Sequence, residues 1–404
     1  MATLHVLGGG EWQVPTVRAA KAMGHRVVVT DMHAERPAYA LADAHEVVDL
    51  RDVEGTLAAA RRHRVDGILC DSTDTGVATA AAVADALGLP GIGIEAARRC
   101  TDKAALRECL GAAGIDSVAW RVLDSAAELP AAAAAVGWPL VVKPVDSQSG
   151  RGVRRVAAPA ALADAFAHAL AHSRSRRVLV EAQASGAEFI LDSFSVDGRC
   201  SVLGIAAKQP DAANPTISER ILYLSGAEHE AMAALIEPLH RRVLDAIGLR
   251  RSICHAEYFV DGGRVTPIDI AARGGGVMIY THALPWVSGV DAVAASIRGA
   301  LGEPVVLQPS SPRRGCSIDF LRLPTGEFEA IDGVAEARAL PGVAAVHVAV
   351  QPGETIGSLS NKDDRPGFVV ACGPTSAEAT TTGARAKACL RVRMAHCRVA
   401  VAVN

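Results

Sequence analysis

This 404-residue sequence has few aromatic residues, a small net charge and no long apolar run. Phe, Trp and Tyr make up only 4% of it, which argues against a stacking platform for single-stranded nucleic acid. The 41 basic and 44 acidic side chains nearly cancel, to a formal charge of −3, so nothing indicates a nucleic-acid partner or an anionic membrane. No basic, signal-like segment precedes the first glycines, and no uninterrupted apolar run reaches membrane-spanning length. We therefore expect a cytoplasmic protein with small-molecule partners.

Paired cysteines are absent as well. The nine cysteines are odd in number, scattered, and form no Cys-x-x-Cys pair. This is typical of reduced thiols in a cytosolic protein and excludes a disulfide framework or a zinc knuckle as the organising feature. The sequence has instead 50% hydrophobic and 21% charged residues, enough to fill the cores of two or three domains.

The order of periodic segments predicts an α/β fold, with α+β character beyond the first domain. Residues 1–100 alternate strand-like and helix-like segments, as in Arg26–Asp31 and Val77–Leu87, which predicts an N-terminal doubly wound α/β domain. Residues 101–310 form a second region, in which 115–185 are expected to make a smaller lobe. Residues 311–404 read as a third, C-terminal α/β module.

The first strand ends in three glycines, which raises the alternative of a dinucleotide site. Gly8 and Gly10 match the first two glycines of the Gly-x-Gly-x-x-Gly motif of dinucleotide-binding folds, and Asp31 could contact a ribose. However, Gln13 stands where the third glycine is needed for close packing of helix on strand. A plain strand-to-helix turn is the preferred interpretation, and an NAD-dependent oxidoreductase is disfavoured.

Two lysines and a glycine-rich loop suggest a polyphosphate site. Lys103 opens a predicted helix, and Lys143 ends the apolar strand Pro139–Pro144. Ammonium groups on separate elements can contact different phosphates, and a loop of small residues can bring backbone N–H groups to phosphate oxygens. The loop residues expected to do so are Ser147, Ser149, Gly150 and Gly152.

Acidic residues follow in a fixed order. Glu181 and Glu188 flank a turn and could accept hydrogen bonds from a nucleoside, while Glu257 and Asp269 lie on two predicted neighbouring strands. Two carboxylates so placed can hold Mg²⁺ against phosphate oxygens. Arg273 follows closely and could stabilise charge that develops during group transfer.

Together these segments resemble the ATP-grasp superfamily of carboxylate-amine and carboxylate-thiol ligases, over nearly the whole chain. The resemblance implies an ATP-grasp fold with a two-lobed nucleotide-binding region, ATP as substrate, and Mg²⁺ or Mn²⁺. It implies a lysine strand and phosphate loop at 139–153, an adenine hinge at Glu181, Ala182 and Ala184, and a ribose-binding acid at Glu188. It also implies a metal pair at Glu257 and Asp269. The catalytic candidates are Arg273 and Lys208, and Lys208 would reach the γ-phosphate or an acyl phosphate.

One departure from the family pattern concerns the second metal strand. The family usually has Glu-x-Asn-x-Arg there, whereas this sequence has Asp269-x-Ala271-x-Arg273. Ala271 cannot be a ligand, so a second metal would need another oxygen donor or more water. A catalytically degenerate ATP-binding protein therefore remains an alternative.

The tail narrows the resemblance to L-amino acid ligases. Its segments Leu340–Val343, Gln351–Glu354, Asp364–Gly367 and Val369–Gly373 look like the C-terminal domain of those enzymes. The leading hypothesis is thus an ATP-dependent ligase that joins a carboxylate, through an acyl phosphate, to an amine, with ADP and phosphate released. The expected substrates are amino acids, and a homodimer is the expected assembly. A bicarbonate-using carboxylase is the second enzyme hypothesis.

Overall fold

The N-terminal part folds around a small parallel sheet in a computed structural model that describes residues 1–395 and 401–402. The strand order is β3-β2-β1-β4, and all pairings are parallel. Strands β1 and β2 are buried almost throughout, because helices cover both faces. The predicted α/β domain is thus observed. Its elements are β1 (Thr3–Leu7), α1 (Val14–Ala22), β2 (Arg26–Asp31), β3 (Ala44–Val47), α2 (Val53–His63), β4 (Gly67–Leu69) and α3 (Val77–Leu87).

Two short helices, α4 (Ile94–Thr101) and α5 (Lys103–Ala112), connect this domain to the next. The break between them is made by Asp102, which is extended and whose side chain accepts hydrogen bonds from the backbone N–H groups of Ala104 and Ala105. This cap confirms the predicted helix start. It places Lys103 in the first turn of α5, facing the rest of the molecule.

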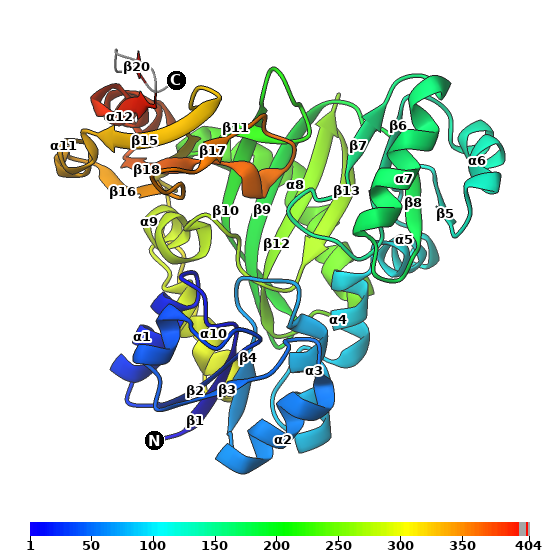
Figure 1. Cartoon of the computed structure of the whole chain (residues 1–404). Coiled ribbons are helices and arrows are strands. Elements are labelled where there is room, and N and C mark those ends of the chain that lie inside the picture. Colours follow the sequence, from blue (N-terminus) through cyan, green and yellow to red (C-terminus); the bar gives the residue numbers. More distant parts are fainter. Residues whose placement is uncertain (396–400, 403–404) are drawn as a thin grey trace.

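The small lobe is a four-stranded antiparallel sheet with two helices packed on it (Figure 1). The order β5-β8-β6-β7 brings the strand of Lys143 next to the strand of Glu181, with Val141 opposite Glu181. Its elements are β5 (Trp120–Leu123), α6 (Leu129–Val136), β6 (Leu140–Pro144), β7 (Arg154–Val156), α7 (Leu162–His172) and β8 (Val178–Ala182).

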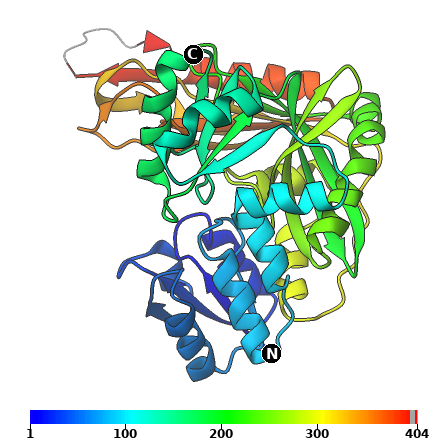
Figure 2. The same cartoon turned by 90° about the vertical axis from the view of Figure 1, so that its right-hand side faces the viewer.

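An eight-stranded sheet forms the centre of the molecule, with β9 beside both β12 and β10 (Figure 1). Figure 2 shows the N-terminal domain, in blue, below the green strands of this sheet. It begins with an antiparallel set in which β12 and β13 are the two neighbouring strands predicted for Glu257 and Asp269, and α8 and α10 pack against it. The elements are β9 (Ala187–Val196), β10 (Arg199–Pro210), β11 (Ser218–Tyr223), α8 (Gly226–Ile247), β12 (Ser252–Asp261), β13 (Arg264–Ala271), α9 (Leu284–Ser288) and α10 (Ala292–Ala300).

The C-terminal part continues this same sheet. Its strands β14 (Gly315–Phe320), β18 (Gly367–Gly373) and β16 (Val343–Val348) complete the order β13-β12-β9-β10-β11-β14-β18-β16. Residue 310 therefore marks no break in the main sheet, although the C-terminal part also has a second sheet of its own. The remaining elements are β15 (Gly326–Asp332), α11 (Val334–Ala339), β17 (Thr355–Ile356), α12 (Ser376–Cys389), β19 (Arg391–Met394) and β20 (Val401–Ala402).

The cysteines within the described residues are unpaired: all eight are free, and Cys316 and Cys372 approach to 3.9 Å between sulfurs. The ninth, Cys397, lies outside the described residues. Across residues 1–395 and 401–402, no helix combines the length and the apolar character that crossing a membrane requires.

Candidate active site

A cavity of about 690 Å³ lies where the small lobe, the central sheet, the N-terminal domain and a C-terminal segment meet. It collects residues from all parts of the chain. Twelve of the fourteen site residues predicted from the sequence line it: Lys103, Lys143, Ser147, Ser149, Gly150, Glu181, Ala184, Glu188, Lys208, Glu257, Asp269 and Arg273. Two, Gly152 and Ala182, do not line it.

Lys143 and Glu181 form a buried ion pair on the small-lobe side of the cavity, and Arg107 of α5 completes a triad. Arg107 Nη2 lies 2.9 Å from Glu181 Oε2 and also donates to the carbonyl of Ile268. Burial lowers the pKa of Lys143, an effect that the Glu181 carboxylate opposes. The Glu181 side chain, predicted to contact a nucleoside, therefore anchors two cations in this structure.

The glycine-rich loop between β6 and β7 is held on both sides. Lys103 Nζ donates to the carbonyl of Ser147 at 2.7 Å, and Gln148 bonds to the backbone N–H of Asp74 at 2.8 Å in the N-terminal domain. Ser149 and Gly150 have positive φ values of 59° and 74°, the region in which glycine is most at ease. This loop thus covers the cavity and reaches the neighbouring domain.

Gly152 closes the loop for a steric reason. Its φ is +76°, and a Cβ there would lie 2.7 Å from Pro144 Cγ and 2.8 Å from His172 Cβ. Its role is therefore in the close packing of the loop on the lobe, beside the cavity rather than in its wall.

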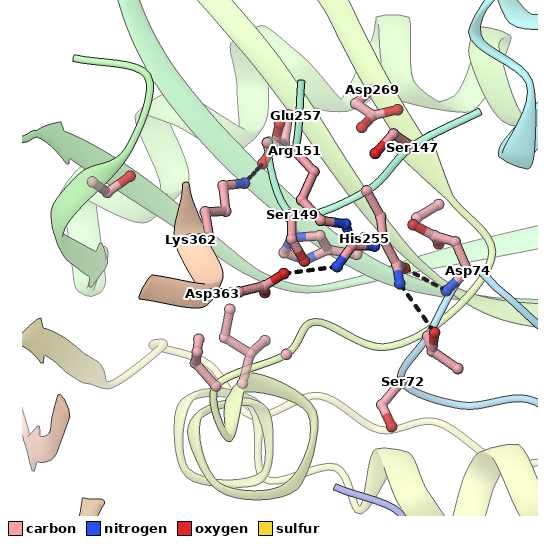
Figure 3. A pocket seen from close by; sticks show the side chains of 18 of the residues that line it. Ser72, Asp74, Ser147, Ser149, Arg151, His255, Glu257, Asp269, Lys362 and Asp363 are labelled. Carbon is pink, nitrogen blue, oxygen red and sulfur yellow. Dashed lines mark hydrogen bonds and ion pairs between the residues drawn. The ribbon is translucent and has the colours of Figure 1, made fainter. Parts of the chain in front are cut away.

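Lys208 of β10 bridges two carboxylates on the central sheet. Its ammonium pairs with Glu188 and lies 3.0 Å from Glu257 Oε1. Lys362 Nζ lies 3.4 Å from the same Glu257 oxygen, a contact that Figure 3 shows. Burial alone would raise the pKa of Glu257, but these two ammonium groups hold it well below its usual value. Glu257 is thus ionised, and in this structure two ammonium groups neutralise its charge.

Glu257 and Asp269 are direct partners in the β12–β13 register, so their side chains share one sheet face. Burial acts to raise the pKa of Asp269, yet Lys103, at 4.0 Å, keeps it below its ordinary value. Two ionised carboxylates fit Mg²⁺, which in such sites takes one or two carboxylates and completes its shell with water and substrate phosphates. Within 1–395 and 401–402 no cluster of three or more metal-binding side chains occurs, so a shell completed by protein alone is not available. Ala271 adds no metal ligand, and its partner in the β12–β13 register is His255.

Arg273 is held by the N-terminal domain. Its Nε and Nη2 lie 2.8 and 3.2 Å from the two carboxylate oxygens of Asp74, a bidentate pair. Arg273 therefore faces the cavity at the junction of two domains rather than standing free. This partner is 199 positions away in the sequence, and no local pattern marks it.

His255 lines the same face, two residues before Glu257. Its Nδ1 lies 2.7 Å from Asp192 Oδ1, and Asp192, fully buried, also accepts a hydrogen bond from Tyr223. The ring is consequently fixed in orientation. Figure 3 shows it among the labelled residues of the cavity.

Sequence reasoning missed several cavity residues. Lys362, Asp363 and Arg365 come from the segment before β18, and Asp363 pairs with Arg151 of the glycine-rich loop at 2.7 Å (Figure 3). The tail pattern Asp364–Gly367 was singled out only as part of the resemblance to a C-terminal domain. Nothing in it indicated that this segment reaches the cavity.

Three stretches of the chain match known families. Residues 17–91 match the ATP-grasp N-terminal domain, residues 136–281 the ATP-grasp domain, and residues 319–395 the L-amino acid ligase C-terminal domain 2. The chain is 28% identical over 314 residues to the uncharacterized protein y4rH of Sinorhizobium fredii, covering 76% of this chain and 64% of that protein. It is 35% identical over 186 residues to a formate-dependent phosphoribosylglycinamide formyltransferase of Parasynechococcus marenigrum, covering 44% and 47%. The matched region thus spans about half to two thirds of these relatives.

Among solved structures, the L-amino acid ligase from Bacillus licheniformis is similar over nearly the whole chain. The TM-score is 0.82 at 20% identity, with 98% of this chain and 99% of that chain covered. The similarity confirms the predicted ATP-grasp fold, with its N-terminal α/β domain, two-lobed middle and C-terminal α/β part.

Proposed function

Because the chain belongs to the ATP-grasp superfamily of ligases, we propose that it joins a carboxylic acid to an amine at the expense of ATP. The observation that carries this proposal is the arrangement in one cavity of two lysines, a glycine-rich loop and two register-paired carboxylates. That set suits a triphosphate and its divalent cation. A site that holds ATP and a divalent cation can activate a carboxylic acid by phosphorylating it, and the activated acid can then react with an amine.

The nucleotide would lie between the small lobe and the central sheet. Lys143 and Lys103 would contact its phosphates, while the backbone of the loop around Ser149 and Gly150 would supply N–H donors. Ala182, Ala184 and Glu188 are our candidates for the adenine hinge and the ribose contact. The Arg107–Glu181–Lys143 triad has a net charge of +1, so a phosphate group beside it would balance a buried charge.

Glu257 and Asp269 would hold Mg²⁺ or Mn²⁺. When bound, the ion would neutralise phosphate charge and polarise the group that is transferred. In the structure Glu257 is paired with Lys208 and Lys362. Once Glu257 binds the divalent cation instead, those two ammonium groups would be free to turn toward phosphate oxygens.

The reaction would proceed in two displacements. A carboxylate oxygen of the acid attacks the γ-phosphorus of ATP, the bond to the β-phosphate oxygen breaks, and ADP leaves. The amine then attacks the acyl phosphate carbon, inorganic phosphate leaves, and the amine loses one proton. Lys208 and Arg273 would stabilise the charge on the transferred group, and positioning provides most of the acceleration. The loop held by Gln148 and Arg151 would keep water from the acyl phosphate.

The C-terminal match to an L-amino acid ligase domain favours amino acids as both substrates. The experiment is release of ADP and phosphate from Mg²⁺-ATP across pooled amino acids and bicarbonate, with mass spectrometry of the product. Turnover that needs two amino acids and yields an amide supports the proposal. Turnover with bicarbonate would assign a carboxylase instead, and ATP binding without stimulated turnover would favour a degenerate site, for which Ala271→Asn is the first variant to make.

A further inference from the structure

Two buried cysteines face each other across a pair of strands in the C-terminal part. Cys316 of β14 and Cys372 of β18 are direct partners in the antiparallel register, and their sulfurs lie 3.9 Å apart. Cys316 is fully buried, and only 5% of Cys372 is exposed. Three other thiols donate hydrogen bonds to backbone carbonyls instead, namely Cys70, Cys109 and Cys389. The contact between two sulfurs therefore sets this pair apart from those thiols.

The backbone geometry of the pair suits a covalent bond between the sulfurs. The N–H of Cys372 donates to the carbonyl of Gly342 at 2.7 Å, on the side of β18 that faces away from β14. The two cysteines thus form a non-hydrogen-bonded pair, in which the Cα atoms are about 4.5 Å apart. A disulfide spans Cα distances of roughly 4.4–6.8 Å with a sulfur–sulfur bond of about 2.05 Å, so each sulfur would have to move by only about 1 Å.

The surroundings hold the two strands together at this point and favour one of the thiols as the reactive one. The Trp286 indole Nε1 donates to the carbonyls of Gly315, at 3.0 Å, and Gly373, at 3.4 Å, the residues next to the cysteines. The guanidinium of Arg314 lies over the same indole ring, 4.2 Å from its centroid. The contact with the Cys316 thiol lowers the pKa of Cys372, and the charge of Arg314 lowers it further, against the opposing effect of burial. Cys372 is therefore the thiol that ionises first.

We propose that Cys316 and Cys372 are a modification site, a dithiol that a hydroperoxide oxidises reversibly to a disulfide that clamps β18 to β14. Neither cysteine lines the cavity of the candidate active site, so this inference is independent of the proposed ligase activity. A hydroperoxide is the oxidant of choice because both sulfurs are almost completely covered, and a bulky disulfide oxidant would have no room for its mixed-disulfide intermediate.

The oxidation takes two steps. The Cys372 thiolate attacks one oxygen of hydrogen peroxide, the O–O bond breaks, and the hydroxide that leaves takes up the proton lost by the thiol to give water. Cys372 is then a sulfenic acid. The Cys316 sulfur attacks the Cys372 sulfur, the S–O bond breaks, and a second water leaves with the Cys316 proton. In total, two thiols are oxidised to one disulfide and the peroxide is reduced to two waters.

The bond would fasten the C-terminal elements to the central sheet. Strand β18 pairs with β16 and packs against α12, and Figure 1 shows these elements grouped at one end of the molecule. The two cysteines are 56 positions apart in the sequence. A disulfide that closes a loop of this length restricts the unfolded chain, so the oxidised protein should be more stable than the reduced one.

The direct test uses the full chain, reduced, freed of reductant and exposed to increasing amounts of hydrogen peroxide. Remaining thiols are alkylated in denaturant, and the protein is digested with trypsin without reduction. The two cysteines fall in separate tryptic peptides, residues 315–322 and 363–385, each of which holds one cysteine. We expect mass spectrometry to find these two peptides joined, with two hydrogens fewer than their sum, and dithiothreitol to separate them again.

The other outcomes of this digest would overturn the proposal. One is that both thiols are still alkylated at peroxide doses that oxidise the partly exposed Cys109 and Cys389. Another is that Cys372 becomes a sulfinic acid without any link to Cys316. A third is that either peptide is joined to a different cysteine peptide.

The second test separates the two sulfurs and measures the clamp. In Cys316→Ser, Cys372 should stop at the sulfenic acid, which dimedone traps, whereas the wild type should give the disulfide instead. Cys254→Ala is the matched control, because Cys254 is also fully buried on a paired strand but has Ser193 as its register partner. Peroxide should raise the urea midpoint of unfolding in the wild type and in Cys254→Ala, and leave it unchanged in Cys316→Ser. Equal midpoints for the disulfide-linked and the reduced wild type would overturn the clamp.

Discussion

Removing the charge of Glu181 should destabilise the protein and make its ATP affinity depend on pH. Glu181 is 3% exposed and contacts Arg107 at 2.9 Å and the ammonium of Lys143. Glu181→Gln keeps the shape but leaves two buried cations without their anion, which raises the net charge of the triad from +1 to +2.

The size of the effect follows from the two contacts. A hydrogen bond to a charged group contributes roughly 1.5–3 kcal/mol, and breaking a buried ion pair on one side costs about 3–5 kcal/mol. We therefore expect the free energy of unfolding, measured by chemical denaturation, to fall by about 3–5 kcal/mol. Glu95→Gln is the control, since that exposed carboxylate pairs only with surface arginines and its loss should leave the curve unchanged.

The same variant predicts a change in nucleotide binding. Burial lowers the pKa of Lys143 and the Glu181 carboxylate opposes that shift, so without Glu181 the pKa should fall further. The ammonium, and with it the phosphate contact, would then be lost as pH rises. Calorimetric titration should show ATP binding that weakens between pH 6.5 and 8.5 in Glu181→Gln more than in the wild type. An unfolding free energy within about 1 kcal/mol of wild type, with no added pH dependence, would refute the role of the triad.

Three further predictions concern the loop, the metal site and acid stability. At Gly152, φ is +76° and neighbouring atoms occupy the space of a Cβ, so Gly152→Ala should lower the free energy of unfolding by about 1–3 kcal/mol. Gly150 has a similar φ but open space around it, so Gly150→Ala should lower this free energy less, and thermal melts compare the two variants. Asp269→Asn should weaken the response of turnover to Mg²⁺ by at least about 10- to 100-fold in a metal titration, and an unchanged titration would remove Asp269 from the metal site. Burial lowers the pKa of His5 to about 4 and that of His240 to about 3, below the 6.5 of an unfolded chain. Their stabilising contribution is therefore complete above pH 6.5 and is lost progressively as pH falls toward 4, and melts that do not change over that window would contradict it.

The sequence alone predicted the elements that carry the site, because their signals are local. Arg26–Asp31 and Val77–Leu87 were predicted with the bounds that the structure has, and the helix that Lys103 opens begins where it was predicted. The lysine strand, the glycine-rich loop and the paired carboxylates are likewise each marked by a short sequence motif. Those motifs predicted twelve residues that line one cavity.

The tertiary structure decided what those residues contact. Glu181 was predicted to touch a nucleoside, but it binds Arg107, which stands 74 positions earlier, and Lys143. Glu257 is held by Lys362, 105 positions away, and Arg151 of the loop by Asp363, 212 positions away. No pattern along the chain encodes such pairs, since they depend on how separate sheets pack.

The extent of the central sheet was decided in the same way. The tail from residue 311 was predicted as a module of its own, whereas β14, β18 and β16 continue the sheet that holds Lys208 and Glu257. Periodicity marks each of these segments as a strand, but backbone hydrogen bonds join strands regardless of side chain. The sequence by itself therefore determined which residues are candidates for a triphosphate and its cation, and only the fold, by adding the C-terminal strands to that sheet, brought Lys362, Asp363 and Arg365 to the same cavity.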